Sequence, residues 1–163
     1  MKAYTADELL ELSLGFEENA RELYRQWAQL FASTPDVAAF WSEYASDEAS
    51  HALLLEELRQ RLSPEQLATR IENELAGDTK RLLAFLQKEQ NIEDLDQAYH
   101  FANMIETSEI NPLFETIMST FGKDEKTNSL LRLQLTEHIG KLTNNFPKRF
   151  SRPELRQAIK VQS

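Results

Sequence analysis

Three kinds of feature are absent or rare in the sequence: cysteine, turn-forming residues and long apolar runs. Among 163 residues there is no cysteine, which excludes disulfide bonds, a thiolate zinc site and an iron–sulfur centre within this chain. Four glycines and five prolines are few, while Ala, Leu, Glu, Gln and Lys abound, which favours long helices over many turns. No apolar run has the length that a membrane-spanning helix needs.

The charge balance and the first residues restrict the partners and the compartment. A net charge of −9 argues against general nucleic-acid binding, because a phosphate backbone attracts proteins with an excess of positive charge. The first residues lead into an acidic amphipathic segment and contain no apolar signal core. We therefore expect a cytoplasmic protein with no nucleic-acid or membrane partner, long enough for one domain with a sizeable core.

Start and stop signals divide the chain into four long helical segments. Thr5 with Glu8 three residues later forms a capping-box pattern, and Pro35 suits the first position of the next helix. Pro112 should kink the third segment, and Pro147 should end the fourth. We expect long helices over 5–32, 35–62, 92–121 and 126–145, a helical crossover over 63–90 that breaks at Gly77-Asp78, a turn at Gly122-Lys123-Asp124, and no strand.

Short turns join the first helix to the second and the third to the fourth, so each pair should be antiparallel. This predicts an all-α fold: an antiparallel four-helix bundle over residues 1–146, with a long helical crossover between its second and third helices. Residues 147–163 form a basic extension with five basic residues and one acidic residue. Its net charge of +4 leaves −13 for the rest of the chain, and we expect it to dock on that acidic body or on a neighbouring subunit.

Glu48-Ala49-Ser50-His51 interrupts the apolar stripe of the second helix. Apolar residues recur there in steps of three and four, and Glu48 and His51 occupy two positions of the same stripe. A carboxylate buried without a partner costs several kcal/mol, so something must compensate for its charge. A metal ion is the obvious candidate.

The other three helices carry similar residues on their apolar stripes. Two of the three histidines of the chain lie on a stripe, whereas His100 does not. Each interruption lies near the middle of its helix, so antiparallel packing brings the side chains to a common height. The six candidate ligands are Glu17, Glu48, His51, Glu106, Glu109 and His138.

Four buried carboxylates without a cation would be very costly, and two divalent ions would balance their charge. Glutamate oxygen with imidazole nitrogen suits iron or manganese, and zinc is also chemically acceptable. Tyr24 lies two turns beyond Glu17 on the same helix face, where its hydroxyl can hydrogen-bond close to the ions.

This arrangement resembles the ferritin-like superfamily, and within it the rubrerythrin-type diiron domain, over nearly the whole chain up to about residue 146. In that family two helices each provide a glutamate and the other two each provide Glu-x-x-His. Glu17 takes the ligand position of a segment similar to the first-helix motif, and Glu48-Ala49-Ser50-His51 is similar to the second. Glu106-Thr107-Ser108-Glu109, followed by Pro112-Leu113-Phe114, resembles the rubrerythrin third helix with its extra glutamate, and His138 resembles the fourth-helix histidine.

One position departs from the family pattern. The fourth-helix glutamate would fall at residue 135, where this chain has Leu135; Glu137 is one position out of register with His138. The site could therefore hold two metals with a weaker second position, hold one metal, or be a relic, and Glu109 is a candidate replacement.

The resemblance implies a metal-dependent oxidoreductase that reduces peroxide or dioxygen with Fe(II). Electrons would come from another protein, because the chain lacks the cysteine-rich module attached in many rubrerythrins, and a homodimer is expected. Two alternatives stay open: a metal-binding or iron-handling protein without turnover, and a helical scaffold that has lost its site.

Overall fold

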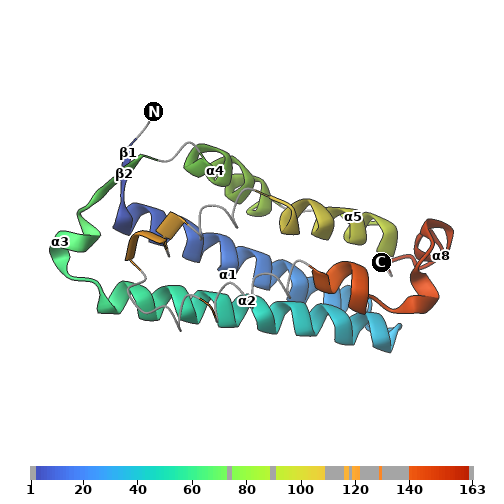
Figure 1. The fold of residues 1–163 in the computed structure, drawn as a ribbon. Helices are drawn as coiled ribbons and strands as arrows, with labels where there is room; N and C mark the ends of the chain where they lie inside the picture. The colour runs from blue at the N-terminus through green and yellow to red at the C-terminus, as the bar shows by residue number, and fades with distance from the viewer. Residues whose placement is uncertain are drawn as a thin grey trace.

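Two long helices, α1 (Ala6–Leu30) and α2 (Pro35–Arg61), form the largest part of the structure (Figure 1). The computed structural model describes residues 3–72, 75–88, 91–108, 116–117, 119–121, 129 and 140–161, and this part is mostly helical. The contact between α1 and α2 is the most extensive one between any two described elements. The prediction of a mostly helical fold is confirmed.

The local signals that begin these helices act as expected. The backbone N–H of Glu8 donates to the Thr5 hydroxyl at 3.1 Å, and the Thr5 N–H donates to the Glu8 carboxylate at 2.7 Å. This capping box satisfies backbone donors that the first turn of α1 leaves without partners. Pro35 is the first residue of α2, where the missing N–H of proline costs no helical hydrogen bond.

Contacts between side chains establish that α1 and α2 are antiparallel and set their register. At one end of the pair the rings of Trp27 and Trp41 lie with centroids 5.0 Å apart. At the other end the Arg59 side chain donates to the Glu11 carboxylate at 3.1 Å. Residues early in α1 therefore lie beside residues late in α2, as the short turn between the helices requires.

The crossover after α2 differs from the prediction. It contains α3 (Pro64–Leu67), β2 (Arg70–Glu72) and α4 (Leu75–Leu86). β2 pairs antiparallel with β1 (Ala3–Thr5), with Tyr4 opposite Ile71. The prediction that the chain has no strands is therefore wrong at these two three-residue segments, whose pairing joins positions too distant in sequence for a local pattern to indicate.

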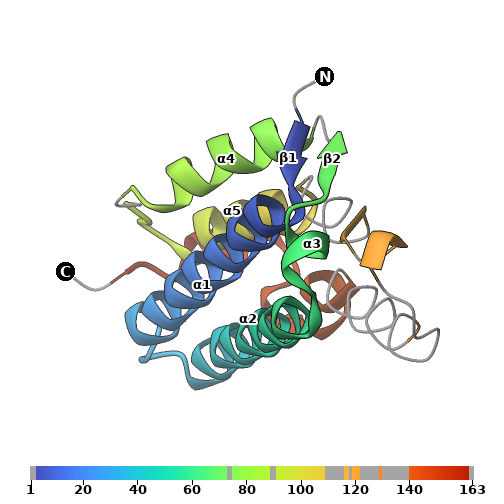
Figure 2. The same cartoon turned by 90° about the vertical axis from the view of Figure 1, so that its left-hand side faces the viewer.

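The predicted break at Gly77-Asp78 is also wrong. Both residues lie in the first turn of α4, where an acidic side chain interacts favourably with the helix dipole and a glycine costs only about 1 kcal/mol. α4 packs against α1 on the side opposite to α2, and Figure 2 shows this layering in a view along the helices.

The third long helix begins and ends differently from the prediction. α5 (Leu95–Glu106) begins after Asp94, whose carboxylate accepts from the Gln97 N–H at 3.0 Å, and not near residue 92. It ends at Glu106, so it does not continue through residues 107–108, which form a turn and a bend. Residues 116–117 and 119–121 are helical again. Pro112 and the turn predicted at 122–124 lie outside the described residues.

The last part of the chain packs on the body of the protein, as its charge predicts. Residues 140–145 are helical, and Lys141 donates to Asp47 of α2 at 2.7 Å. A 3-10 turn, η1 (Lys148–Phe150), and the short helix α8 (Pro153–Gln157) follow. Arg149 pairs with Asp36. The basic extension is thus docked on acidic residues of the same chain.

Arg156 holds this extension against the start of α5. Its side chain is only 5% exposed, and its Nε donates to Asp96 at 2.8 Å. Its Nη1 donates at 3.1 Å to the carbonyl oxygens of Phe150 and Ser151, and its guanidinium lies 4.2 Å from the centre of the Tyr99 ring. One buried cation therefore joins η1, α8 and α5.

Among the described residues, no helix is both long enough and apolar enough to cross a membrane.

Replacing Arg156 with alanine should destabilise the protein by about 3 kcal/mol, because the buried Asp96 carboxylate then loses its buried cationic partner. The free energy of unfolding, measured by urea titration, checks this value. The matched control is Arg152→Ala, since Arg152 is exposed, and it should change stability by less than about 0.5 kcal/mol. Equal effects of the two substitutions would contradict the role given to Arg156.

Candidate metal centre

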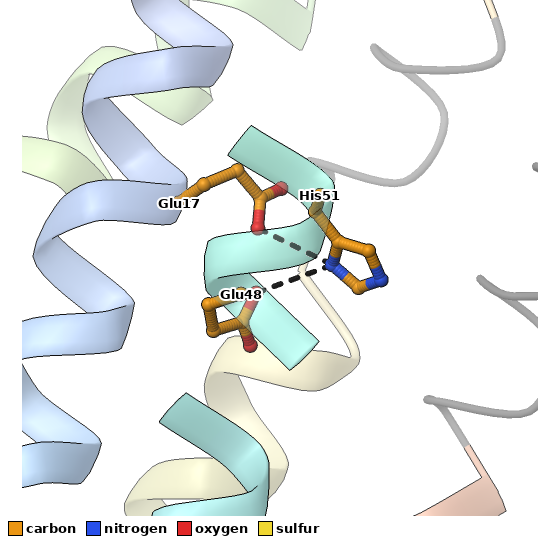
Figure 3. A group of neighbouring side chains, drawn as sticks. All are labelled: Glu17, Glu48 and His51. Carbon is orange, nitrogen blue, oxygen red and sulfur yellow. Dashed lines mark hydrogen bonds and ion pairs between the residues drawn. The ribbon is translucent and has the colours of Figure 1, made fainter. Parts of the chain in front are cut away.

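Three ionisable side chains meet in the interior between α1 and α2. Glu17 comes from α1, and Glu48 and His51 come from successive turns of α2, so that all three point toward one another (Figure 3). Each offers one ligand atom, and these atoms lie within 4.8 Å of one another. The side chains are only 4–7% exposed. The structure therefore brings together three of the six candidate ligands named from the sequence.

His51 links the two carboxylates. Its Nδ1 lies 3.3 Å from Oε2 of Glu48, a hydrogen bond, and 3.4 Å from Oε2 of Glu17. The contact with Glu17 is electrostatic and lacks hydrogen-bond geometry, so Oε2 of Glu17 is buried without a hydrogen-bond donor. Buried carboxylate oxygens are ordinarily hydrogen-bonded or bound to a cation.

Burial and the closeness of the charged groups shift the pKa values of Glu17 and His51. Loss of hydration raises the pKa of Glu17 well above its ordinary value, and the nearby Glu48 carboxylate raises that pKa further. Burial by itself lowers the pKa of His51, but the close contacts with the negatively charged carboxylates of Glu17 and Glu48 outweigh this effect and raise that pKa to about 9. The cluster therefore attracts positive charge, and a proton on His51 supplies part of it.

Glu106 is the fourth candidate ligand that the structure describes. It is the last residue of α5, it is buried, and its Oε1 accepts a 2.5 Å hydrogen bond from the Tyr24 hydroxyl. Burial, followed by the charges of Glu106 and Glu48, raises the pKa of Tyr24 well above its ordinary value. Burial is also the largest cause of the raised pKa of Tyr44, followed by the charges of Glu106 and Glu48. Both phenols therefore stay protonated next to both carboxylates.

Aromatic rings close this end of the site. Tyr24 contacts Tyr44 edge-on at 5.1 Å between centroids and stacks on Trp41 at 5.7 Å with the planes 4° apart. Trp27 and Phe40 pack on the same group. All five side chains are buried, so they exclude water from the side of the carboxylates on which the phenols lie.

The structure does not describe every residue singled out in the sequence. Glu109 and His138 lie outside the described residues, as do Leu135 and Glu137. His100, which the stripe pattern excludes as a ligand, lies exposed next to Asp96, away from the cluster. The Tyr24 hydroxyl, expected to hydrogen-bond close to the ions, donates to Glu106, one of the candidate ligands. Ser13, buried one turn before Glu17, escapes the sequence pattern, because a small hydroxyl residue fits an apolar stripe without interrupting it.

The donor set suits a divalent cation. Two carboxylates and an imidazole converge, one carboxylate oxygen has no donor, and a third buried carboxylate, that of Glu106, accepts a hydrogen bond from Tyr24. Oxygen ligands with a single imidazole fit iron or manganese well, and zinc adequately. Among the described residues this is the one group of three or more ligand-type side chains with such spacing.

Metal-free protein should lose stability as the pH rises from 6.5 to 9. The pKa of His51 is raised in the folded state from 6.5 to about 9, so its stabilising contribution is complete below pH 6.5 and disappears through about pH 9. The raised pKa of Glu17 acts in the same direction, since its ionisation also favours unfolding. Urea titrations across this range measure the effect. His51→Gln should flatten the curve, and an unchanged slope in that variant would contradict the assignment.

Replacing Tyr24 with phenylalanine should cost about 1–3 kcal/mol in metal-free protein, because the buried Glu106 carboxylate loses a short hydrogen bond. Tyr99→Phe is the matched control. The Tyr99 ring packs on Phe146, and its hydroxyl makes no hydrogen bond to another residue within the described part of the chain, so the change should stay below about 0.5 kcal/mol. Urea unfolding curves of both variants measure these losses of stability. Similar losses in the two variants would refute the role of the Tyr24 hydroxyl.

Comparison with known proteins agrees with this geometry. The family model described as rubrerythrin matches residues 8–139, which include all six candidate ligands. Neither the curated proteins nor the solved structures gave a significant match. The match covers well over half of the chain and includes the helices that bring Glu17, Glu48 and His51 together. This chain belongs to the rubrerythrin family and contains its ferritin-like diiron domain.

Proposed function

We propose that this protein is a rubrerythrin-like diiron-carboxylate oxidoreductase that uses Fe(II) to reduce peroxide or dioxygen. One observation carries the proposal: Glu17, Glu48 and His51 converge in the interior, with one carboxylate oxygen lacking any donor. A divalent ion is the partner that relieves both the missing contact and the excess negative charge. Membership of the rubrerythrin family supports iron as that ion.

We propose Glu17, Glu48, His51 and Glu106 as ligands, completed by Glu109 and His138, around two ions in an antiparallel four-helix bundle. Manganese or zinc are the chemical alternatives to iron. Support for the fourth helix comes from Lys141, which contacts Asp47, the residue directly before Glu48. Support for Glu106 comes from Tyr24, whose pKa responds to both Glu106 and Glu48.

The bound iron would supply the electrons for reduction and an open position for the oxidant. The protein's own groups do the rest. His51 holds a proton on the metal-free cluster up to about pH 9, and this proton must leave when its nitrogen becomes a ligand. The Tyr24 hydroxyl holds the Glu106 carboxylate in one orientation, and the aromatic rings beside it keep water away from that side.

Electrons must reach the site from outside the chain. The sequence contains no cysteine, so it cannot hold a thiolate-bound iron centre of its own. We therefore propose an external electron-donor protein as a partner. The homodimer stays a prediction.

Metal binding without turnover is the second candidate. Leu135 stands where the family pattern places a fourth-helix glutamate, which leaves the second ion with fewer ligands. Such a protein would bind Fe(II) and would not oxidise it when peroxide is added. A scaffold without a site would bind no iron at all.

Protein loaded with Fe(II) without oxygen should retain iron after desalting, and peroxide should convert that iron to the ferric state. Elemental analysis measures the metal, and near-ultraviolet absorption follows its oxidation. The double variant Glu48→Ala/His51→Ala removes two ligands and should lose most of the iron. Its melting temperature should no longer respond to added metal, because stabilisation by a ligand requires binding to the folded state.

The matched control is Glu56→Ala/His100→Ala, which removes an exposed glutamate and an exposed histidine. It should behave as the parent does. Iron that stays ferrous after peroxide would favour the second candidate. A parent protein that retains no iron would refute both metal-dependent functions.

A further inference from the structure

Ser13 is a fully buried hydroxyl without a partner. It lies on α1 one turn before Glu17, on the same buried face of the helix, and its relative exposure is 0%. Its Oγ makes no hydrogen bond. A buried hydroxyl loses the hydrogen bonds that water would give it, so the interior of a protein seldom leaves one unpaired.

Other hydroxyl side chains in the helices of this chain hydrogen-bond to a backbone carbonyl of their own helix. Ser50 donates to the carbonyl of Ser46 at 3.0 Å, and Thr120 donates to that of Thr116 at 2.7 Å. Each uses the carbonyl four residues earlier, which is the usual partner for a hydroxyl within a helix. Ser13 has the same option at Leu9 and does not use it. Its donor and acceptor capacity is therefore available to a group that comes from elsewhere.

The register of α1 and α2 places Ser13 at one end of the metal centre. Tyr24 faces Tyr44 on one side of Glu17, and Glu11 faces Arg59 further along on the other side. Because Glu17 lies opposite His51, Ser13 falls on the His51 side, at the height of Leu55. Among the described residues of α1 and α2, Ser13 is the one buried polar side chain on this side of the cluster.

The two ends of the site therefore differ in chemistry. The Tyr24 end is closed by stacked rings, and its phenol is already bonded to Glu106. At the Ser13 end the neighbouring residues Leu10 of α1 and Leu55 of α2 are fully buried, and the Ser13 hydroxyl has no hydrogen-bond partner. A small molecule bound at this end would meet a single hydrogen-bonding side chain of α1 and α2 beyond the cluster itself.

We propose that the Ser13 hydroxyl binds the small oxygen-containing ligand of the metal centre, water, hydroxide or peroxide, on its His51 side. The inference rests on the proposed metal site and deepens it, because it says where the exogenous ligand lies and which side chain holds it. A hydroxyl suits this ligand since it can donate to an anionic oxygen and also accept from a protonated one. Ser13 holds the ligand and is not itself a metal ligand.

Binding of azide to Co(II)-loaded protein tests this proposal without any measurement of turnover. Co(II) reports ligand binding through its visible absorption, and azide is a small anion that accepts hydrogen bonds. Ser13→Ala should bind Co(II) as the parent does and bind azide about tenfold more weakly, the change expected for one lost hydrogen bond to a charged group. Ser13→Thr, which keeps the hydroxyl, should stay within about threefold of the parent.

Ser50→Ala is the matched control, since it removes an exposed hydroxyl already bonded to its own helix. Its azide affinity should equal that of the parent. The melting temperature of metal-free Ser13→Ala should be no lower than that of the parent, because the substitution removes an unpaired buried hydroxyl.

The outcomes separate the two proposals. A parent protein that binds no Co(II) overturns the metal site and this inference together. Normal Co(II) binding with no azide binding to the parent, or with equal azide affinity in the parent and in Ser13→Ala, overturns this inference alone. Loss of Co(II) binding in Ser13→Ala also overturns it, because Ser13 would then be a ligand or a structural residue.

Discussion

The burial of two carboxylates against one imidazole, between α1 and α2, is the contact on which the rest of the structure depends. Glu17 and Glu48 lie in a region that the helix pattern otherwise fills with apolar side chains. Their repulsion and their lost hydration oppose folding, and a proton on His51 offsets only part of that cost. The site is thus built at the expense of stability, as expected for groups that serve a ligand.

The rest of the fold keeps that costly region in place, and α5 is the clearest example. Its first turn is held by Arg156 and Lys160, which pair with Asp96 and Asp94. Its last residue, Glu106, is held by the Tyr24 hydroxyl. One end of the helix is therefore tied to the C-terminal extension and the other to the metal centre. A basic segment far along the chain thereby helps to position a candidate ligand.

The two sides of the centre suit different tasks. On one side the phenols of Tyr24 and Tyr44 stay protonated, the Tyr24 hydroxyl orients the Glu106 carboxylate, and the buried rings packed beside them exclude solvent. On the other side the hydroxyl of Ser13 is buried and has no hydrogen-bond partner. A small reactant approaching a metal there would meet one hydrogen-bonding group and little else. The asymmetry gives a physical reason for the reactant to occupy one side only.

The sequence by itself determined the helices and the side chains that face the interior. Periodicity and caps are local properties, so the starts of α1 and α2 and the inward direction of Glu17, Glu48, His51 and Glu106 were predictable. Only the tertiary structure decided which of these groups touch. The hydrogen bond from Tyr24 to Glu106 and the pairing of β1 with β2 each join residues more than 50 positions apart in sequence. The burial of Arg156 depends on a contact of the same kind, its bond to Asp96. The role proposed for Ser13 could not be inferred from the sequence. The absence of a hydrogen-bond partner for its hydroxyl is a property of three-dimensional packing, and the periodic pattern of apolar residues does not report it.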